Sequence, residues 1–184
     1  MAHDTSSLKV YKRYPLTNIA VYNGVTLAHY GLGGAGIIVG YARWPLLGWV
    51  AGLVYLVFAL AQMYVVMPLV VCPSCAYRRI EGARCVSAMN LVSARIAPVA
   101  PPEDFALRAR GALCHNNLYM ASLIAPLVII VPALVIAFSW PLLAIFLAVA
   151  ALFAVRLFVV FPRVACGHCA TKGRCPNAKA MGIV

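Results

Sequence analysis

The sequence predicts an all-α integral membrane protein with four transmembrane helices, arranged as two tandem parallel helical-hairpin repeats with cysteine-rich loops on the cytoplasmic face. Three observations lead to this prediction: an apolar composition, four long stretches that are uncharged or nearly uncharged, and a motif that occurs twice. Of 184 residues, 64% are hydrophobic and 10% are charged, and the mean hydropathy is +0.92. Soluble domains have an apolar share nearer half.

Four stretches are long enough to cross a bilayer, because each is close to the ~20 residues that its hydrocarbon core requires. They lie at roughly residues 18–42, 46–69, 117–138 and 141–161. A span of full membrane length follows the charged start, so we expect no removable signal peptide and a first span that is retained as an anchor. The expected organisation is an N-terminal cytoplasmic segment (1–17), a first repeat (18–97), a linker (98–113) and a second repeat (114–184).

Residues 62–78 and 156–172 carry the same motif, in which an apolar run reaches a proline and then a C-x-x-C pair. A third cysteine follows, and Trp-Pro-Leu-Leu begins the run in both copies, at Trp44 and Trp140. Internal repeats imply related packing of the two halves. Because each repeat crosses the membrane twice, both enter from the same face, and their symmetry axis should run along the membrane normal.

The basic residues predict the orientation. Only Arg43 lies on the turn between the first two spans, so the positive-inside rule places both termini and the central loop in the cytoplasm, with a prokaryotic inner membrane expected. The formal charge of +11 follows from this topology and from attraction to anionic lipids. No recognition motif accompanies the charges, so we expect no nucleic-acid binding.

All seven cysteines fall on the predicted cytoplasmic side. In a reducing compartment, thiols at C-x-x-C spacing are more often metal ligands or redox groups than disulfides. The candidate metal ligands are Cys72, Cys75, Cys85, Cys114, Cys166, Cys169, Cys175 and His168.

We call each C-x-x-C pair together with the third cysteine that follows it an arm. Each arm offers three cysteines, which is one fewer than the four ligands that structural zinc or an iron–sulfur cluster needs. Each arm can hold its own centre, with Cys114 completing the first and His168, His115 or an exogenous group completing the second. Alternatively, the two C-x-x-C pairs share one four-thiolate centre, or a partner subunit completes the site. We favour two centres, because Cys85 and Cys175 both follow an arginine.

The arms resemble ferredoxin-type or zinc-knuckle ligand sets, at the level of the motif only. Cys175-Pro176 resembles the cysteine–proline pair that ends bacterial ferredoxin motifs. This resemblance favours an iron–sulfur cluster, of [4Fe–4S] type, with zinc as the alternative. Dithiol redox chemistry and binding of a soft metal such as copper(I) are the remaining hypotheses.

Ionisable residues are rare inside the predicted spans, which contain no Asp or Glu. This argues against a proton pump, an ion channel or a transporter of charged solutes. His29 is expected to hydrogen-bond a neighbouring helix, and it is a weaker candidate for binding haem or a quinone headgroup, with Tyr22, Asn23, Thr26 and Tyr30 forming a polar notch. Arg156 is expected to reach the cytoplasmic surface by snorkelling.

The sequence therefore predicts an iron–sulfur electron-transfer subunit of a larger membrane complex, which relays electrons between a partner and a quinone or another subunit. The alternatives are a zinc-stabilised structural subunit and a protein that handles soft metals. No Ser-His-Asp set, phosphate loop or paired carboxylate is present, so we do not expect catalysis by the chain alone.

Overall fold

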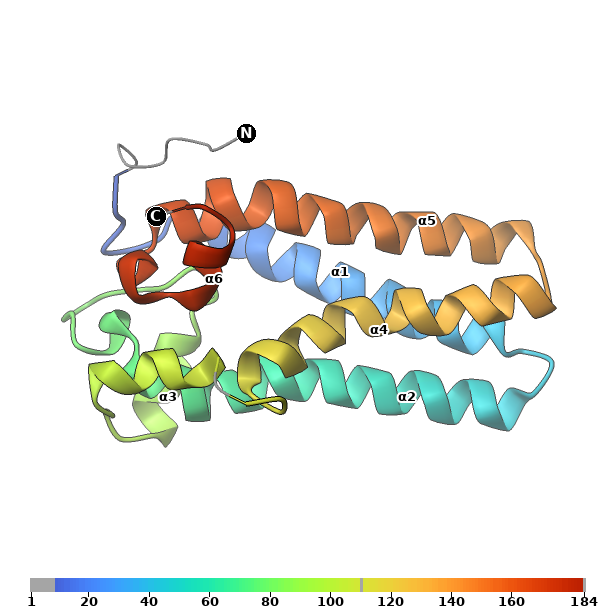
Figure 1. Ribbon diagram of the computed structural model, residues 1–184, viewed down its shortest axis with the longest axis horizontal. Coiled ribbons are helices and arrows are strands. Elements are labelled where there is room, and N and C mark those ends of the chain that lie inside the picture. The colour runs from blue at the N-terminus through green and yellow to red at the C-terminus, as the bar shows by residue number, and fades with distance from the viewer. Residues whose placement is uncertain (1–8, 110, 184) are drawn as a thin grey trace.

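Four long helices run side by side in the computed structural model, which describes residues 9–109 and 111–183 (Figure 1). They are α1 (Leu16–Gly40), α2 (Pro45–Ala61), α4 (His115–Ile136) and α5 (Trp140–Val155). Three stretches are long and apolar enough to cross a membrane, namely Pro45–Ser74, His115–Ile136 and Trp140–His168. These three helices are consistent with a multi-pass membrane protein.

Helix α1 is as long as the others but is not among those three. Its polar side chains account for the difference, because Tyr22, Thr26, His29 and Tyr30 are buried inside the bundle. The outward side of α1 stays apolar, with exposed Leu16, Val21, Leu27, Leu32 and Val39. The predicted first span is therefore a helix of the bundle, and its mean hydropathy is lowered by an inward-facing polar stripe.

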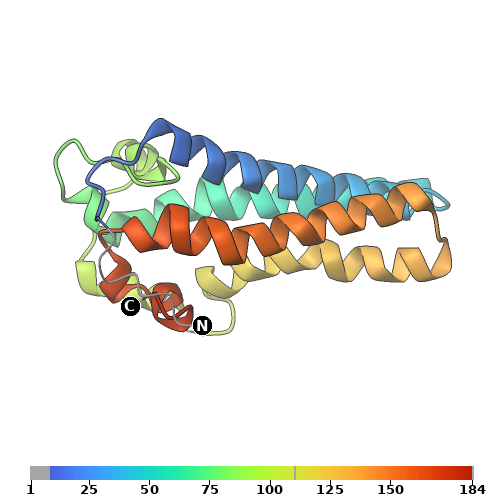
Figure 2. The same cartoon turned by 90° about the horizontal axis from the view of Figure 1, so that it is seen from above.

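The packing places α2 and α5 at opposite corners of the bundle. Helices α1 and α4 contact each other and both of the remaining helices. They lie between α2 and α5 in the view of Figure 1, and on either side of them in the view of Figure 2. Glycines on α1 allow this close approach. A Cβ atom built on Gly36 would come within 2.6 Å of Ile130 on α4, and one on Gly34 within 2.6 Å of Leu56 on α2.

Helices α2 and α5 end in the same succession of local structures. Each continues into ten residues of wide π-helical turns, Gln62–Val71 (η1) and Arg156–Ala165 (η5), and each of these contains a proline. Tight 3-10 turns follow at Cys72–Ser74 (η2) and Cys166–His168 (η6), and Cys75 and Cys169 are then extended. Proline removes a helical N–H donor, and π-helical turns often mark functional sites. Both C-x-x-C motifs thus leave the bundle with the same backbone shape.

The remaining elements are short and lie at the end of the bundle where α1 begins, together with both described ends of the chain (Figure 1). They are η3 (Ala76–Arg78), α3 (Met89–Ile96), η4 (Pro102–Ala109), η7 (Lys172–Arg174) and α6 (Pro176–Ala180). The opposite end carries only the turns around Arg43 and Ser139. Residues 1–8 of the expected N-terminal segment and Arg110 of the expected linker lie outside the described residues.

The close contact between α1 and α2 makes a testable prediction at Gly52. A Cβ atom there would lie 2.5 Å from Ile38 Cγ1 and 3.1 Å from the Gly34 carbonyl oxygen, so Gly52→Ala should lower the free energy of unfolding by about 1–3 kcal/mol. The control is Gly24→Ala, because nothing lies within 4 Å of its Cβ position and alanine should stabilise the helix by roughly 0.5–1 kcal/mol. Thermal unfolding in detergent, followed by circular dichroism, measures both. Equal melting temperatures for the two variants would contradict this packing.

Candidate metal centre

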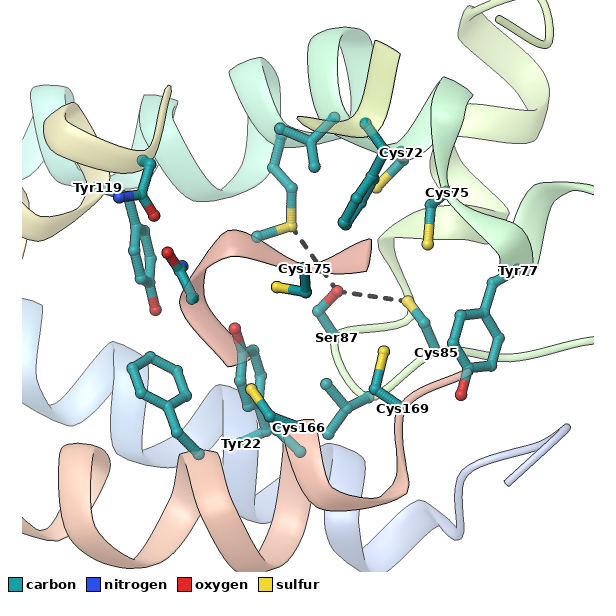
Figure 3. A pocket seen from close by; sticks show the side chains of 18 of the residues that line it. Tyr22, Cys72, Cys75, Tyr77, Cys85, Ser87, Tyr119, Cys166, Cys169 and Cys175 are labelled. Atoms are coloured by element: carbon teal, nitrogen blue, oxygen red, sulfur yellow. Dashed lines mark hydrogen bonds between the residues drawn. The ribbon is translucent and has the colours of Figure 1, made fainter. Parts of the chain in front are cut away.

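Six of the seven cysteines line one cavity at the loop-bearing end of the bundle. The cavity has a volume of about 160 Å³, and its cysteines are Cys72, Cys75, Cys85, Cys166, Cys169 and Cys175. Figure 3 shows Cys72 and Cys75 on one wall and Cys166 and Cys169 on the opposite wall, with Cys175 and Cys85 between them. The structure therefore brings together the two arms, which lie far apart in the sequence and follow helices at opposite corners of the bundle.

The segment that precedes α1 holds the two arms against each other, and Tyr14 is its central residue. The Tyr14 backbone N–H donates to the Arg84 carbonyl at 2.9 Å, and the Arg84 side chain donates to the Tyr14 carbonyl at 3.1 Å. The Tyr14 hydroxyl donates to the carbonyl of Ala165, directly before Cys166. Burial, followed by the nearby Cys169, raises the pKa of Tyr14, which keeps this hydroxyl protonated as a donor.

Further contacts of the same segment join both arms. Tyr11 donates from its backbone N–H to the His168 carbonyl at 3.0 Å and accepts at its own carbonyl from the Tyr77 hydroxyl at 2.8 Å. That hydroxyl accepts in turn from the Ala170 N–H at 3.2 Å. We call residues 9–15, which thread between the arms, the N-terminal clasp.

Thr171 connects thiols of the two arms directly. Its backbone N–H donates to Cys169 Sγ at 3.4 Å, and its hydroxyl lies 3.4 Å from Cys75 Sγ. Cys85 Sγ lies 3.5 Å from the Ser87 hydroxyl. Hydrogen bonds of this kind stabilise negative charge on sulfur and tune thiolate-bound metal centres.

The thiols surround the cavity without converging on one point. Within the described part of the chain, no three His, Cys, Asp or Glu side chains form a group that could hold a metal ion. All seven cysteines carry thiol groups. The pKa of Cys169 is raised to about 12, mainly by burial and further by Cys75 and Cys175 nearby. A thiol with this pKa is a poor nucleophile at neutral pH, so Cys169 itself is not poised for thiol–disulfide exchange.

Two of the predicted ligands do not line this cavity. Cys114 caps the N-terminus of α4, where its sulfur accepts from the Asn117 N–H at 3.5 Å. His168 turns toward the N-terminal clasp, with Nδ1 2.8 Å from the Lys9 carbonyl oxygen and its ring stacked on Tyr11. His115, which the sequence offered as an alternative ligand, does line the cavity.

Aromatic rings form one wall of the cavity, and a buried arginine lies behind them. Tyr22, Tyr119 and Phe161 line the cavity, and the guanidinium carbon of Arg156 lies 4.9, 5.6 and 5.1 Å from their respective ring centroids. Its Nε donates to the Tyr119 hydroxyl at 2.9 Å, and Nη1 donates to Thr26. Arg156 is 0% exposed. The expectation that it snorkels to the surface was wrong, because hydroxyl groups and aromatic faces inside the bundle solvate its charge.

His29 forms the predicted contact with a neighbouring helix. Its Nε2 lies 2.9 Å from the carbonyl oxygen of Leu123 on α4, and the side chain is 0% exposed. Thr26 is also fully buried, and Tyr30 is hydrogen-bonded to Ser122 at 3.0 Å. These residues form packed interhelical contacts. Of the expected polar notch, Tyr22 alone lines the cysteine cavity.

The sequence reasoning missed Tyr14, Thr171 and the buried position of Arg156. One signal was available for Arg156, because it aligns with Gln62 in the duplicated motif and Gln62 is also buried. A polar residue recurring ten positions before each C-x-x-C pair indicates an inward-facing position. No comparable signal marks Tyr14, whose contacts join segments distant in the sequence.

Comparison of the chain with protein-family models, with curated proteins and with solved structures finds no match. The function is therefore inferred from the geometry and chemistry of the residues themselves.

Proposed function

We propose that the protein is a membrane-embedded electron-transfer subunit whose cysteine cavity holds an iron–sulfur centre, of [4Fe–4S] type. The observation that carries the proposal is the gathering of six cysteines, from both C-x-x-C arms and the loops that follow them, around one cavity. Cysteines of two segments that lie about 80 residues apart in the sequence meet in this way only if the fold directs them to a common place. Sulfur is the ligand that iron–sulfur clusters require.

The spread of the thiols supports a cluster over a single ion. Zinc needs four ligands at about 2.0–2.3 Å from one point, and no such convergence of three side chains occurs among the described residues. A cluster binds its cysteines through several iron atoms, so its ligands are distributed around a volume. The shared cavity also supports one centre between the arms over the two separate centres that the spacing favoured.

The charges around the cavity support an anionic occupant. No Asp or Glu of residues 9–109 and 111–183 lines it, and Arg156 lies behind its aromatic wall. A buried guanidinium in a membrane helix is costly by at least about 2.5 kcal/mol. A thiolate-bound cluster carries net negative charge, and Arg156 would offset part of it.

In this proposal the cysteines that line the cavity would hold the centre, and the centre would supply one-electron transfer from a reduced partner to an oxidised acceptor, which is a quinone or another membrane subunit. Helix α1 crosses the membrane as a fourth span, because its outward face is apolar. The two hairpins are a tandem duplication, as supported by the identical succession of turns after α2 and α5. Both termini and the cysteine cavity face the cytoplasm of a prokaryotic cell.

A zinc-stabilised structural subunit is the second candidate. The elements around the cavity are short, and α3 with eight residues is among the longest of them, so a bound zinc ion would help to order these loops.

The two candidates differ in colour and in composition. Protein purified without oxygen should show broad visible absorption that bleaches on reduction, together with iron and acid-labile sulfide. Colourless protein with stoichiometric zinc would support the structural role, and protein without either metal would refute both.

Substitution of single cysteines tests which thiols bind the centre. Cys75→Ser and Cys169→Ser each remove a thiol from opposite walls of the cavity, so both should lower the bound iron at least several-fold, as measured by elemental analysis. Cys114→Ser is the matched control, because Cys114 caps α4 and does not line the cavity, and serine caps a helix well. Iron loss in Cys114→Ser equal to that in Cys75→Ser would show that the cavity does not define the ligand set.

Removal of the Arg156 charge should make the centre harder to reduce. At an effective dielectric constant of about 20, the interaction between the Arg156 charge and the added electron is on the order of 1 kcal/mol. Its loss in Arg156→Gln should lower the one-electron reduction potential of the centre by about 50 mV. Arg156→Lys keeps the charge and should restore most of the potential. Arg163→Gln is the control, since this arginine lies on the same arm but is exposed. Redox titration of the visible absorption measures all three, and equal potentials in Arg156→Gln and Arg163→Gln would exclude this role.

A further inference from the structure

We propose that a second cavity, lined by Arg13, Arg78 and Arg84, binds the phosphate group of an anionic ligand. Its volume is about 330 Å³, and it lies between the loop that follows the first C-x-x-C motif and helix α3. Tyr77 lines both this cavity and the cysteine cavity. The site is nevertheless separate, because none of its arginines lines the cysteine cavity.

Backbone contacts fix the arginines around this cavity. Arg13 and Arg84 pair through an isolated parallel bridge, and Nη2 of Arg84 donates to the Tyr14 carbonyl at 3.1 Å. Nη2 of Arg78 donates to the Ala97 carbonyl at 3.0 Å. The turn between Arg78 and Arg84 contains Gly82 in a left-handed conformation (φ +65), and Arg13 Nη2 lies 4.0 Å from its Cβ position. The guanidinium groups of Arg78 and Arg84 are thus held by hydrogen bonds, and the backbone bridge places Arg13 beside them.

These arginines retain capacity to bind an acceptor. The Nε atoms of Arg78 and Arg84 are enclosed and have no hydrogen-bond partner among the described residues. An enclosed donor without an acceptor is unfavourable, and a bound oxygen anion would supply acceptors close to both side chains.

The charge balance selects an anion, and the residue type selects phosphate. Three guanidinium groups line the cavity against one carboxylate, that of Glu81. No ion pair to these arginines is formed within the described part of the chain. Arginine is the side chain best suited to phosphate, because its planar fork donates two parallel hydrogen bonds to phosphate oxygens.

The surroundings favour a phospholipid headgroup as the source of this phosphate. Leu91 of α3 lines the same cavity, and Leu91, Val92 and Ile96 are 49%, 39% and 51% exposed. Basic pockets beside apolar surface, at the cytoplasmic ends of membrane helices, bind anionic lipid headgroups. Free phosphate would use the same guanidinium groups but not the apolar side of α3.

The experiment compares lipid retention and phosphate binding in variants of the full chain. Protein extracted from membranes containing phosphatidylglycerol is examined by native mass spectrometry, and delipidated protein is titrated with inorganic phosphate by calorimetry. We expect wild type to retain the lipid, and Arg78→Gln/Arg84→Gln to retain at least tenfold less. Arg13→Gln should also weaken retention. This variant controls for misfolding of the double variant, because the Arg13 side chain makes no hydrogen bond to the described residues and its loss should leave the fold intact.

Arg79→Gln is the matched control, since it removes the same charge from the same loop at an exposed position outside the cavity. Loss of lipid in the cavity variants alone supports the headgroup as ligand. Loss of calorimetric phosphate binding in those variants, with lipid retention unchanged, supports a soluble phosphate. Equal loss in Arg79→Gln, or no change in either measurement, would overturn the proposal.

Discussion

The structure depends on the contact of the N-terminal clasp with both cysteine arms. Helices α2 and α5 occupy opposite corners of the bundle, so packing of these two helices does not by itself bring their C-x-x-C ends together. Tyr14 does so, because its backbone pairs with Arg84 and its hydroxyl reaches Ala165. Each hydrogen bond contributes about 0.5–1.5 kcal/mol, and Tyr14 is 1% exposed. A residue that is not itself a cysteine therefore joins the two segments that carry the cavity cysteines.

The same arrangement connects the cysteine cavity with the interior of the membrane bundle. Tyr22 and Tyr119 line the cavity on one side, and on the other they lie against Arg156, which also donates to Thr26. In the proposed function, the polar stripe of α1 therefore solvates the positive charge of Arg156 behind the cavity that the cysteines line. This coupling also explains why α1 is less apolar than the three helices that meet the criteria for a membrane span.

The sequence predicted the helical class, the approximate ends of the long helices and the convergence of the two arms on one end of the bundle. These features follow from apolar run length and from residue types in register, which are local properties. It did not predict that Cys114 would cap α4 or that His168 would stack on Tyr11, because both depend on how distant segments pack. The sequence placed Arg156 at the cytoplasmic surface instead of inside the bundle, because its hydroxyl partners, Thr26 and Tyr119, lie on two other helices. Cysteine spacing favoured two centres, whereas the fold gathers the thiols around one cavity.

The central claim is that cysteines of both arms bind one shared centre, and differential alkylation tests it most directly. Protein isolated without oxygen is treated with iodoacetamide before and after metal removal by a chelator under reducing conditions, and each cysteine is quantified by mass spectrometry. The account predicts that at least four of the six cavity cysteines, with members from both arms, gain reactivity together on metal removal, while Cys114 does not change. Equal reactivity of these six cysteines before and after chelation, or gains confined to one arm, would contradict it.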